Sequence, residues 1–257
     1  MGILNDKQLL ITGVLNTSSI AYHVARVARD EGAETILTGF GRGLSITRRV
    51  AAKLGADVEV IELDASDSGS VDQAAAALRD RWEHVDGIVH AIGYAPPSCL
   101  DAPMLDAPWD DVATAIHVST YSLAELARAF GPLLAEAHGA SIVGLDFDAT
   151  VAWPGYNWMG VAKAGLESLN RYLARELGPD QVRVNLISAG PIRTIAAKSI
   201  EAFKMFQDNW GDRSPLGWDP EDAEPVARSV VALLSDFFPK TTGELIHVDG
   251  GYHAFGA

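Results

Sequence analysis

The stretch that decides the fold is QLLITGVLNTSSIA, residues 8–21. It opens with a short apolar run typical of a buried strand, and the glycine that follows begins a polar turn. From Ser19 to Glu31, apolar side chains then recur at helical spacing. A short strand, a glycine turn and an amphipathic helix predict the first unit of a parallel α/β sheet.

Outward from this unit, apolar strands and amphipathic helices keep alternating along the chain. We expect further strands at residues 34–38, 58–63, 87–91, 140–145, 182–188 and 244–248. We expect further helices at residues 44–54, 70–84, 107–137, 155–177 and 220–235. Because such alternation is typical of a parallel sheet covered on both faces, we predict one doubly wound, Rossmann-type α/β domain of about seven strands over residues 1–257. A (β/α)8 barrel is the alternative, which the strand count and the first glycine turn disfavour.

The composition limits the possible partners. The chain of 257 residues has a formal net charge of −14 and a pI near 4.8. A surface this acidic argues against nucleic acid and against an anionic membrane as partners. The single cysteine, Cys99, fits a reducing compartment and the N-terminus lacks a signal-peptide pattern, so we expect a cytoplasmic protein. The seven histidines show no metal-ligand spacing, so no metal is expected.

The turn after the first strand is a candidate phosphate site. The usual dinucleotide fingerprint is G-x-G-x-x-G, and here only Gly13 is present, with Ser18 and Ser19 at the start of the helix. A serine at a helix N-terminus caps free N–H groups, and its hydroxyl can also reach a phosphate. The residues alone leave open whether Ser19 is an N-cap or part of a cofactor site.

The ends of the next strands fit other parts of a dinucleotide. Many NAD-binding folds carry an acid after the second strand, whereas this chain has Phe40, whose ring could lie flat on an adenine. Asp64, after the third strand, could reach the adenine edge, and the Ala-Ile-Gly run at 91–93 lets the backbone approach a flat ligand. Phe40 offers no charge for a 2′-phosphate, which favours NADH, while Arg42 keeps NADPH possible.

Tyr156 and Lys163 form the most informative pair in the chain. They are 7 residues apart, which at about 100° per residue is within about 20° of two helical turns. Both side chains are therefore expected on one face of the helix at residues 155–177, where a phenol and an ammonium can contact two parts of one bound molecule. Taken alone, such a pair is more often an exposed lysine and a half-buried structural tyrosine than a site.

Together, five segments resemble the short-chain dehydrogenase/reductase superfamily. They lie at residues 13–21, 89–93, 146–148, 156–163 and 189–194, and the last two, YNWMGVAK and AGPIRT, are the most specific. Within the superfamily the chain is similar, over nearly its whole length, to the enoyl-acyl-carrier-protein reductases of bacterial fatty acid synthesis, in particular to the type of the mycolic acid pathway.

The spacing within the fourth segment separates two groups of this superfamily. Its ketone and alcohol dehydrogenases have Tyr-x-x-x-Lys, with a serine about a dozen residues before the tyrosine. Here Gly160 stands four residues after Tyr156, and Val143 stands thirteen before it. The resemblance therefore implies reduction of a C=C bond rather than of a C=O bond.

The resemblance implies three catalytic residues. Tyr156 would donate a hydrogen bond to the thioester oxygen, on which negative charge develops. Lys163 would hold the nicotinamide ribose, and its charge would lower the pKa of Tyr156. Phe147 would press on the thioester or the nicotinamide, the alternative being a core phenylalanine at a strand end.

The resemblance also implies the residues that bind the cofactor, NADH, and the substrate. The expected cofactor-binding residues are Gly13, Val14, Ser19, Ile20, Phe40, Asp64, Ala65, Ala91, Ile92, Gly93, Lys163, Ile192 and Thr194. The expected substrate pocket comprises Tyr94, Trp153, Met159, Ile200 and Phe203, with a substrate-binding loop and helix at about residues 194–212. This segment is shorter than in the mycolic acid pathway type, which favours ordinary fatty acyl lengths over very long ones.

The partner implied is an acyl carrier protein that carries the enoyl chain. Because such carriers are acidic, we expect a docking patch of Arg193, Lys198 and Lys204 near the substrate loop. The resemblance also implies a homotetramer, in which the helices at 107–137 and 155–177 pair. Two other functions remain: a short-chain reductase for a ketone or a specialised enoyl thioester, and a non-catalytic nicotinamide-binding regulator, which would not need Tyr156 and Lys163.

Overall fold

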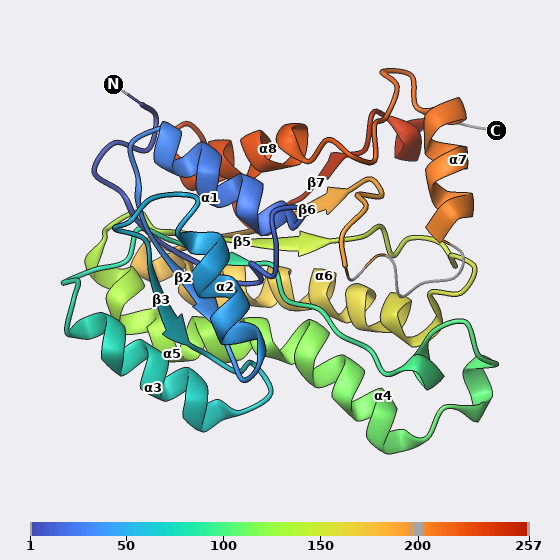
Figure 1. Ribbon diagram of the computed structural model, residues 1–257, viewed down its shortest axis with the longest axis horizontal. Coiled ribbons are helices and arrows are strands. Elements are labelled where there is room, and N and C mark those ends of the chain that lie inside the picture. Colours follow the sequence, from blue (N-terminus) through green and yellow to red (C-terminus); the bar gives the residue numbers. More distant parts are fainter. Residues whose placement is uncertain (1, 196, 198–202, 256–257) are drawn as a thin grey trace.

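In the described part of the chain, seven parallel strands form one central sheet (Figure 1). The computed structural model describes residues 2–195, 197 and 203–255. The strands are β1 (Gln8–Ile11), β2 (Glu34–Gly39), β3 (Glu59–Glu62), β4 (Gly87–His90), β5 (Ser141–Asp146), β6 (Arg183–Ala189) and β7 (Leu245–Val248). Their order in the sheet is β3-β2-β1-β4-β5-β6-β7. This is the doubly wound Rossmann-type fold that the sequence predicts, with the strand order reversing between β1 and β4.

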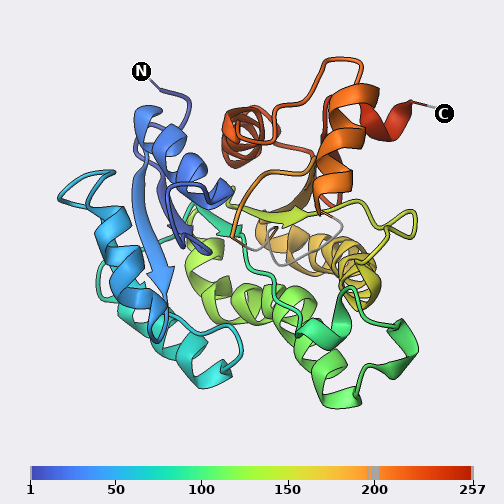
Figure 2. The same ribbon diagram turned by 45° about the vertical axis from the view of Figure 1, so that its right-hand side comes forward.

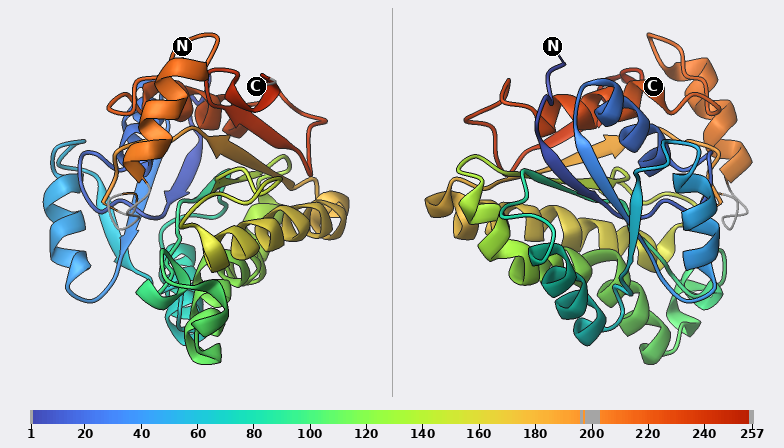
Figure 3. Two further views of the ribbon diagram at one scale, coloured as in Figure 1. Left: turned by 90° about the vertical axis from the view of Figure 1, so that its right-hand side faces the viewer. Right: turned by 60° about the vertical axis from the view of Figure 1, so that its left-hand side comes forward.

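Helices cover both faces of this sheet (Figures 1 and 2). One face carries α1 (Ile20–Asp30), α2 (Gly43–Ala51) and α8 (Glu224–Leu234). The other face carries α3 (Ser68–Arg79), α5 (Ser122–Glu136) and α6 (Asn157–Leu177). Two further helices, α4 (Trp109–Ile116) and α7 (Phe203–Arg213), flank the carboxyl ends of the strands, which face the viewer on the left of Figure 3. None of the described helices is both long and apolar enough to span a bilayer.

Alternating side chains of the strands build two separate cores. In β1, Leu10 joins the core under α3, α5 and α6, while its neighbours Leu9 and Ile11 join the core under α1 and α8. All three are fully buried, as are Ile88 and Val89 of the neighbouring strand. Because each such side chain stabilises the fold by about 1.5–3 kcal/mol, burial on both faces holds the strand ends in fixed positions.

The long helix predicted at residues 107–137 is interrupted. α4 ends at Ile116, a π-helical turn follows at His117–Tyr121, and α5 then continues to Glu136. Inside this turn, Ser119 Oγ accepts a hydrogen bond from Tyr94 N at 2.9 Å and donates one to Tyr94 O at 2.8 Å. The π-helical turn thus lets Ser119 bind the backbone of the loop after β4. The periodicity of the sequence does not predict this turn.

Two helix ends also differ from the predicted bounds. The helix expected at 70–84 ends at Arg79, because Trp82 turns into the core and is only 5% exposed. The helix expected at 220–235 begins at Glu224, where the side chain of Asp222 accepts a hydrogen bond from Glu224 N at 2.9 Å. The other predicted helices and all seven strands are confirmed, with ends that move by up to three residues.

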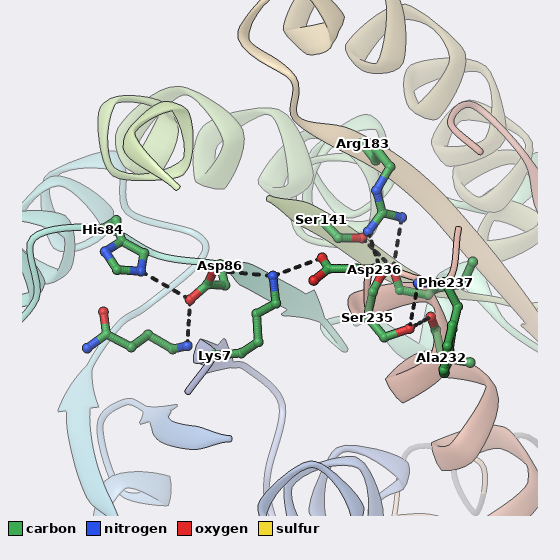
Figure 4. A network of polar contacts seen from close by, with 11 residues as sticks. Lys7, His84, Asp86, Ser141, Arg183, Ala232, Ser235, Asp236 and Phe237 are labelled. Atoms are coloured by element: carbon green, nitrogen blue, oxygen red, sulfur yellow. Dashed lines mark hydrogen bonds and ion pairs between the residues drawn. The ribbon is translucent and has the colours of Figure 1, made fainter. Parts of the chain in front are cut away.

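A polar network fixes the amino-terminal edge of the sheet (Figure 4). The buried guanidinium of Arg183 donates to Leu233 O at 2.9 Å and to Ser235 O at 3.0 Å, at the end of α8. Nearby, Asp86 forms ion pairs with Lys7 at 3.6 Å and with His84 at 3.3 Å. The two Arg183 hydrogen bonds satisfy carbonyls at the end of α8 and so tie α8 to β6.

We expect Arg183→Met to lower the free energy of unfolding by about 2–3 kcal/mol, because two buried carbonyls lose charged donors while the side-chain volume is kept. Arg228→Met is the matched control, since Arg228 is exposed and, among the described residues, pairs with Glu224 on its own helix. It should change the free energy by less than about 0.5 kcal/mol. Denaturant unfolding at one protein concentration measures both, and equal values for the two variants would contradict the assigned role of Arg183.

Candidate active site

The candidate site lies at the carboxyl ends of the strands, where the strand order reverses between β1 and β4. At the end of β1, Thr12 Oγ1 donates to Val89 O at 2.8 Å and accepts from Ala91 N at 3.1 Å. Gly13 follows with a φ of +80°, and a Cβ on it would lie 2.0 Å from Ala91 O. The turn after β1 and the loop after β4 therefore meet backbone to backbone, which only a glycine allows.

Ser19 does not cap α1, contrary to one of its two expected roles. Its hydroxyl instead accepts from Leu15 N and Asn16 N at 3.2 and 3.1 Å, and so holds the loop before the helix. The first N–H groups of α1 lack intrahelical partners and lie at the positive end of the helix dipole, which fits a pyrophosphate. Ile20 is half-buried at this helix start, whereas the side chain of Val14 is fully buried in the core, so Val14 can meet a ligand only through its backbone.

A cavity of about 370 Å³ lies beside the ends of β2 and β3. Its lining residues are Phe40, Gly41, Glu62, Asp64, Asp67, Ser70 and Gln73. The Phe40 ring is 51% exposed, as a stacking surface for adenine requires, and Asp64 lines the same cavity. The expected neighbour Ala65 is buried in the core, and Arg42 does not line the cavity. Three carboxylates in the wall make it a poor site for a 2′-phosphate.

The structure brings Phe147 and Tyr156 together. Their ring centroids are 5.2 Å apart, in an edge-to-face arrangement. Tyr156 is only 7% exposed and lies directly before α6, where Met159 N bonds its carbonyl at 2.9 Å. Burial, with the nearby charge of Asp146, raises the pKa of Tyr156 well above its ordinary value. The expected lowering of this pKa by Lys163 is not found: burial raises it, and the charge that acts on Tyr156 is that of Asp146.

Lys163 lies on α6 beneath the end of β5. Its Nζ donates to Leu145 O at 2.8 Å and is 3.8 Å from Asp146 Oδ1. Burial lowers the pKa of Lys163, and the charge of Asp146 raises it again. His90, on β4, is fully buried. Burial, and after it the charge of Lys163, lowers the pKa of His90 to about 3, so its imidazole is neutral. The site thus holds a lysine paired with a carboxylate and a phenol that stays protonated.

Aromatic side chains from distant segments form one wall of the site. Phe147 contacts Trp153, Phe206 and Trp210, with ring centroids 5.4–5.8 Å apart. Trp210 in turn stacks on Tyr252, with centroids 3.8 Å apart and planes at 8°. Phe203 is buried in the same cluster. The helix α7 therefore packs directly against the residue that contacts Tyr156.

Other expected pocket residues are placed differently. Met159 is buried with Tyr156 in a neighbouring cluster. Tyr94 is 53% exposed, and it is held through its backbone by Ser119 rather than joined to the aromatic wall. Ile200 lies outside the described residues. The pocket expected from the sequence is thus only partly assembled from the residues named for it.

The turn after β6 brings Ile192 and Thr194 to the same edge. Ile192 is buried in the core, and Thr194 Oγ1 accepts from Ala197 N at 3.1 Å. Arg193 forms an ion pair with Glu221 and donates to Gln207 Oε1 at 3.2 Å. The expected docking patch is therefore weakened, because Arg193 is engaged; Lys198 and the side chain of Lys204 lie outside the described residues.

Sequence reasoning missed three residues of this site. Asp146 faces Lys163, Ser119 positions Tyr94, and Tyr252 stacks on Trp210 from near the end of the chain. A carboxylate at the end of an otherwise apolar strand was a usable signal for Asp146. Neither Ser119 nor Tyr252 has such a signal, because their neighbours depend on the tertiary fold.

Fold and site together define a dinucleotide-binding α/β protein with a Tyr-Lys pair beside the cofactor cleft. The model of the enoyl-(acyl carrier protein) reductase family matches residues 13–253, so the chain belongs to this family. It is 44% identical to the NADH-dependent enoyl-(acyl-carrier-protein) reductase of Mycolicibacterium smegmatis, over 97% of each chain. The corresponding identities are 43% for Mycobacterium avium, over 97% of each chain, and 38% for Escherichia coli, over 98% of this chain and 96% of that one. The resemblance inferred from the motifs is confirmed, with higher identity to the two mycobacterial relatives.

We expect Gly13→Ala to weaken NADH binding and to destabilise the fold by at least about 1–2 kcal/mol, because alanine opposes the positive φ. The added methyl would also collide with Ala91 O. Gly43→Ala is the control, since Gly43 begins a helix and has open space around its Cβ position. Fluorescence titration with NADH and thermal unfolding measure the two effects. Unchanged binding and stability in Gly13→Ala would refute the tight β1–β4 approach.

Proposed function

We propose that this protein is an NADH-dependent enoyl-(acyl-carrier-protein) reductase, which reduces the trans-2 double bond of enoyl thioesters in fatty acid synthesis. The observation that carries the proposal is the arrangement of Tyr156, Phe147 and Lys163 at the strand edge of a chain that belongs to this family. The relatives compared above are named as reductases of this type that use NADH.

The cleft fits NADH at three points. Phe40 and Asp64 would hold the adenine end in the cavity beside the ends of β2 and β3. The N-terminus of α1, at Ile20, would bind the pyrophosphate beside Gly13 and Ser19. Lys163 would hold the nicotinamide ribose, with the turn at 192–194 and the loop at 91–93 beside the ring. The carboxylate-lined cavity supports NADH over NADPH.

Bound NADH supplies a hydride to the β-carbon of the enoyl thioester. The task of the protein is to stabilise the negative charge that then develops on the thioester oxygen. Tyr156 suits this task because its raised pKa keeps the phenol protonated and able to donate. Phe147, packed edge to face on Tyr156, fixes the phenol ring and excludes water from it.

The segment at 194–212 would form the acyl-binding wall. In its described part, α7 buries Phe203, Phe206 and Trp210 against Phe147 and Trp153. This buried, apolar wall suits a hydrocarbon chain. The alignment with the Mycolicibacterium smegmatis relative spans 265 positions against the 257 residues of this chain, so that relative contains insertions that are absent here. With the shorter segment placed at 194–212, as expected from the sequence, we propose ordinary fatty acyl lengths rather than very long ones.

The remaining features of the proposal concern assembly and partner. The substrate would arrive on an acyl carrier protein in the cytoplasm. A homotetramer is supported by large apolar side chains that α4, the π-helical turn and α6 leave exposed, namely Trp109 at 74%, Tyr121 at 55% and Tyr172 at 66%. A monomeric mass by light scattering would exclude it. Reduction of a ketone, or no NADH oxidation with any enoyl thioester, would instead support the two alternative functions.

We expect Tyr156→Phe to lower kcat by about 10²–10³-fold with NADH affinity unchanged, because one oxyanion donor is lost. Lys163→Ala should raise the Kd for NADH, because an ammonium that binds the ribose is removed. Tyr172→Phe, an exposed tyrosine on α6, is the control and should leave both constants unchanged. Steady-state kinetics with crotonyl thioester and NADH titration measure these values. Full activity of Tyr156→Phe would refute the donor role.

We expect Trp210→Ala to raise kcat/KM for a hexadecenoyl thioester, relative to a crotonyl thioester, by at least about tenfold, because the indole closes the apolar wall. Trp210→Leu provides a variant with less loss of packing, and Trp109→Ala on exposed α4 is the control. An unchanged ratio in both folded Trp210 variants would show that α7 does not limit chain length.

A further inference from the structure

The carboxylate of Asp146 is the least explained group of the site. It ends β5, and its side chain has no solvent exposure. Among the described residues neither oxygen makes a hydrogen bond of good geometry, although the backbone N–H of Phe147 lies close enough to lower the pKa of Asp146. Burying a carboxylate without hydrogen bonds is unfavourable, so a polar group of this kind calls for a compensating partner.

The compensating partner is Lys163. Its Nζ lies 3.8 Å from Asp146 Oδ1, and its side chain is only 8% exposed. Two more carboxylates, of Glu167 on α6 and of Asp148 in the loop after β5, also raise the pKa of Asp146. Both already accept hydrogen bonds: Glu167 from Ala149 N at 3.3 Å, and Asp148 from Thr150 N at 2.9 Å. Within the described part of the chain, the ammonium of Lys163 is thus the charged group that offsets the burial of Asp146, with the backbone N–H of Phe147 beside it.

The other titratable groups near the pair cannot replace Asp146. His90 on β4 is neutral, because burial holds its pKa near 3. Tyr156 keeps its proton, because burial raises its pKa. His247 on β7 is affected by the charges of Asp148 and Glu167, and burial lowers its pKa. None of these three side chains supplies a negative charge at neutral pH.

We propose that Asp146 is a positioning residue for the reduction: its buried carboxylate keeps Lys163 protonated and holds the ammonium at the end of β5. This inference rests on the proposed function, in which Lys163 binds NADH. On this proposal, the protonation of Lys163 depends on Asp146, a residue outside the Tyr-Lys pair.

The physical basis is the opposition of two effects on Lys163. Burial favours the neutral amine and lowers the pKa, whereas a carboxylate within 4 Å favours the ammonium. The ammonium has three N–H donors, of which Leu145 O takes one, and a neutral amine loses both a donor and the charge. Loss of the carboxylate therefore removes what keeps the lysine charged in a nearly dry environment.

Asp146 and Lys163 each affect the pKa of the other. Burial raises the pKa of Asp146 to about 7, and the charge of Lys163 opposes this rise. When one partner of a buried ion pair is removed, the other is left as an uncompensated charge or becomes neutral. For the lysine, becoming neutral means that the affinity for NADH falls as the pH rises.

The test is the pH dependence of the Kd for NADH, measured by fluorescence titration from about pH 6 to about pH 10. The proteins are the full-length wild type, Asp146→Asn, Asp146→Ser and Asp146→Glu. Asp86→Asn is the matched control, because Asp86 is also a buried aspartate paired with a lysine, Lys7, but at the opposite edge of the sheet. Thermal unfolding of each protein identifies variants that do not fold.

We expect the midpoint at which NADH affinity is lost to move to lower pH by at least about one unit in Asp146→Asn and Asp146→Ser. Above the new midpoint, affinity should fall about tenfold per pH unit relative to the wild type. Asp146→Glu should restore most of the wild-type profile, and Asp86→Asn should keep it while losing stability. A folded Asp146→Asn or Asp146→Ser with the wild-type midpoint would overturn the proposal. Failure of the wild type to bind NADH would instead overturn the proposed function.

Discussion

The parallel orientation of all the described strands is the constraint on which the rest of the structure depends. Because each strand is followed by a connection that returns over a face of the sheet, every loop that leaves a carboxyl end emerges at the same edge. The turn after Gly13, the loop at 91–93, the 146–148 segment and the turn at 192–194 come from distant parts of the sequence. They meet there only because burial on both faces fixes the strand ends, with the Thr12 contacts joining β1 to β4.

The same constraint explains what could be predicted from the sequence. Strands and most helices follow from periodicity, since apolar runs such as residues 87–90 must be buried on both faces. The Tyr-Lys spacing and the segment resemblance predicted one site for Tyr156, Phe147 and Lys163. In the structure Phe147 contacts Tyr156 and Lys163 lies at the end of β5, while the catalytic roles stay predictions. The break at His117–Tyr121 could not be predicted, because it is set by contact with Tyr94. Likewise, the stack of Tyr252 on Trp210 joins residues 42 positions apart in the sequence, which only the tertiary fold brings together.

At the carboxyl edge of the sheet, the proposed hydrogen-bond donor and the proposed acyl-binding wall share one residue, Phe147. Phe147 contacts Tyr156 on one side and the α7 aromatics on the other, so the donor and the acyl-binding wall form one packed unit. A packed aromatic cluster transmits small displacements, because its side chains have little free volume to absorb them. The length of the segment that carries α7 therefore bears on the position of the phenol as well as on the size of the acyl site.

Exclusion of water helps the proposed role of Tyr156 and works against that of Lys163. Burial favours the neutral form of both side chains, which raises the pKa of Tyr156 and lowers that of Lys163. A neutral phenol is the form that donates a hydrogen bond, so the dry site assists Tyr156 directly. An ammonium is the form that binds a ribose most strongly, so the same dryness works against Lys163. A counter-charge is thus needed for the lysine alone, and the carboxylate of Asp146 both supplies it and, by repelling a phenolate, further favours the protonated tyrosine.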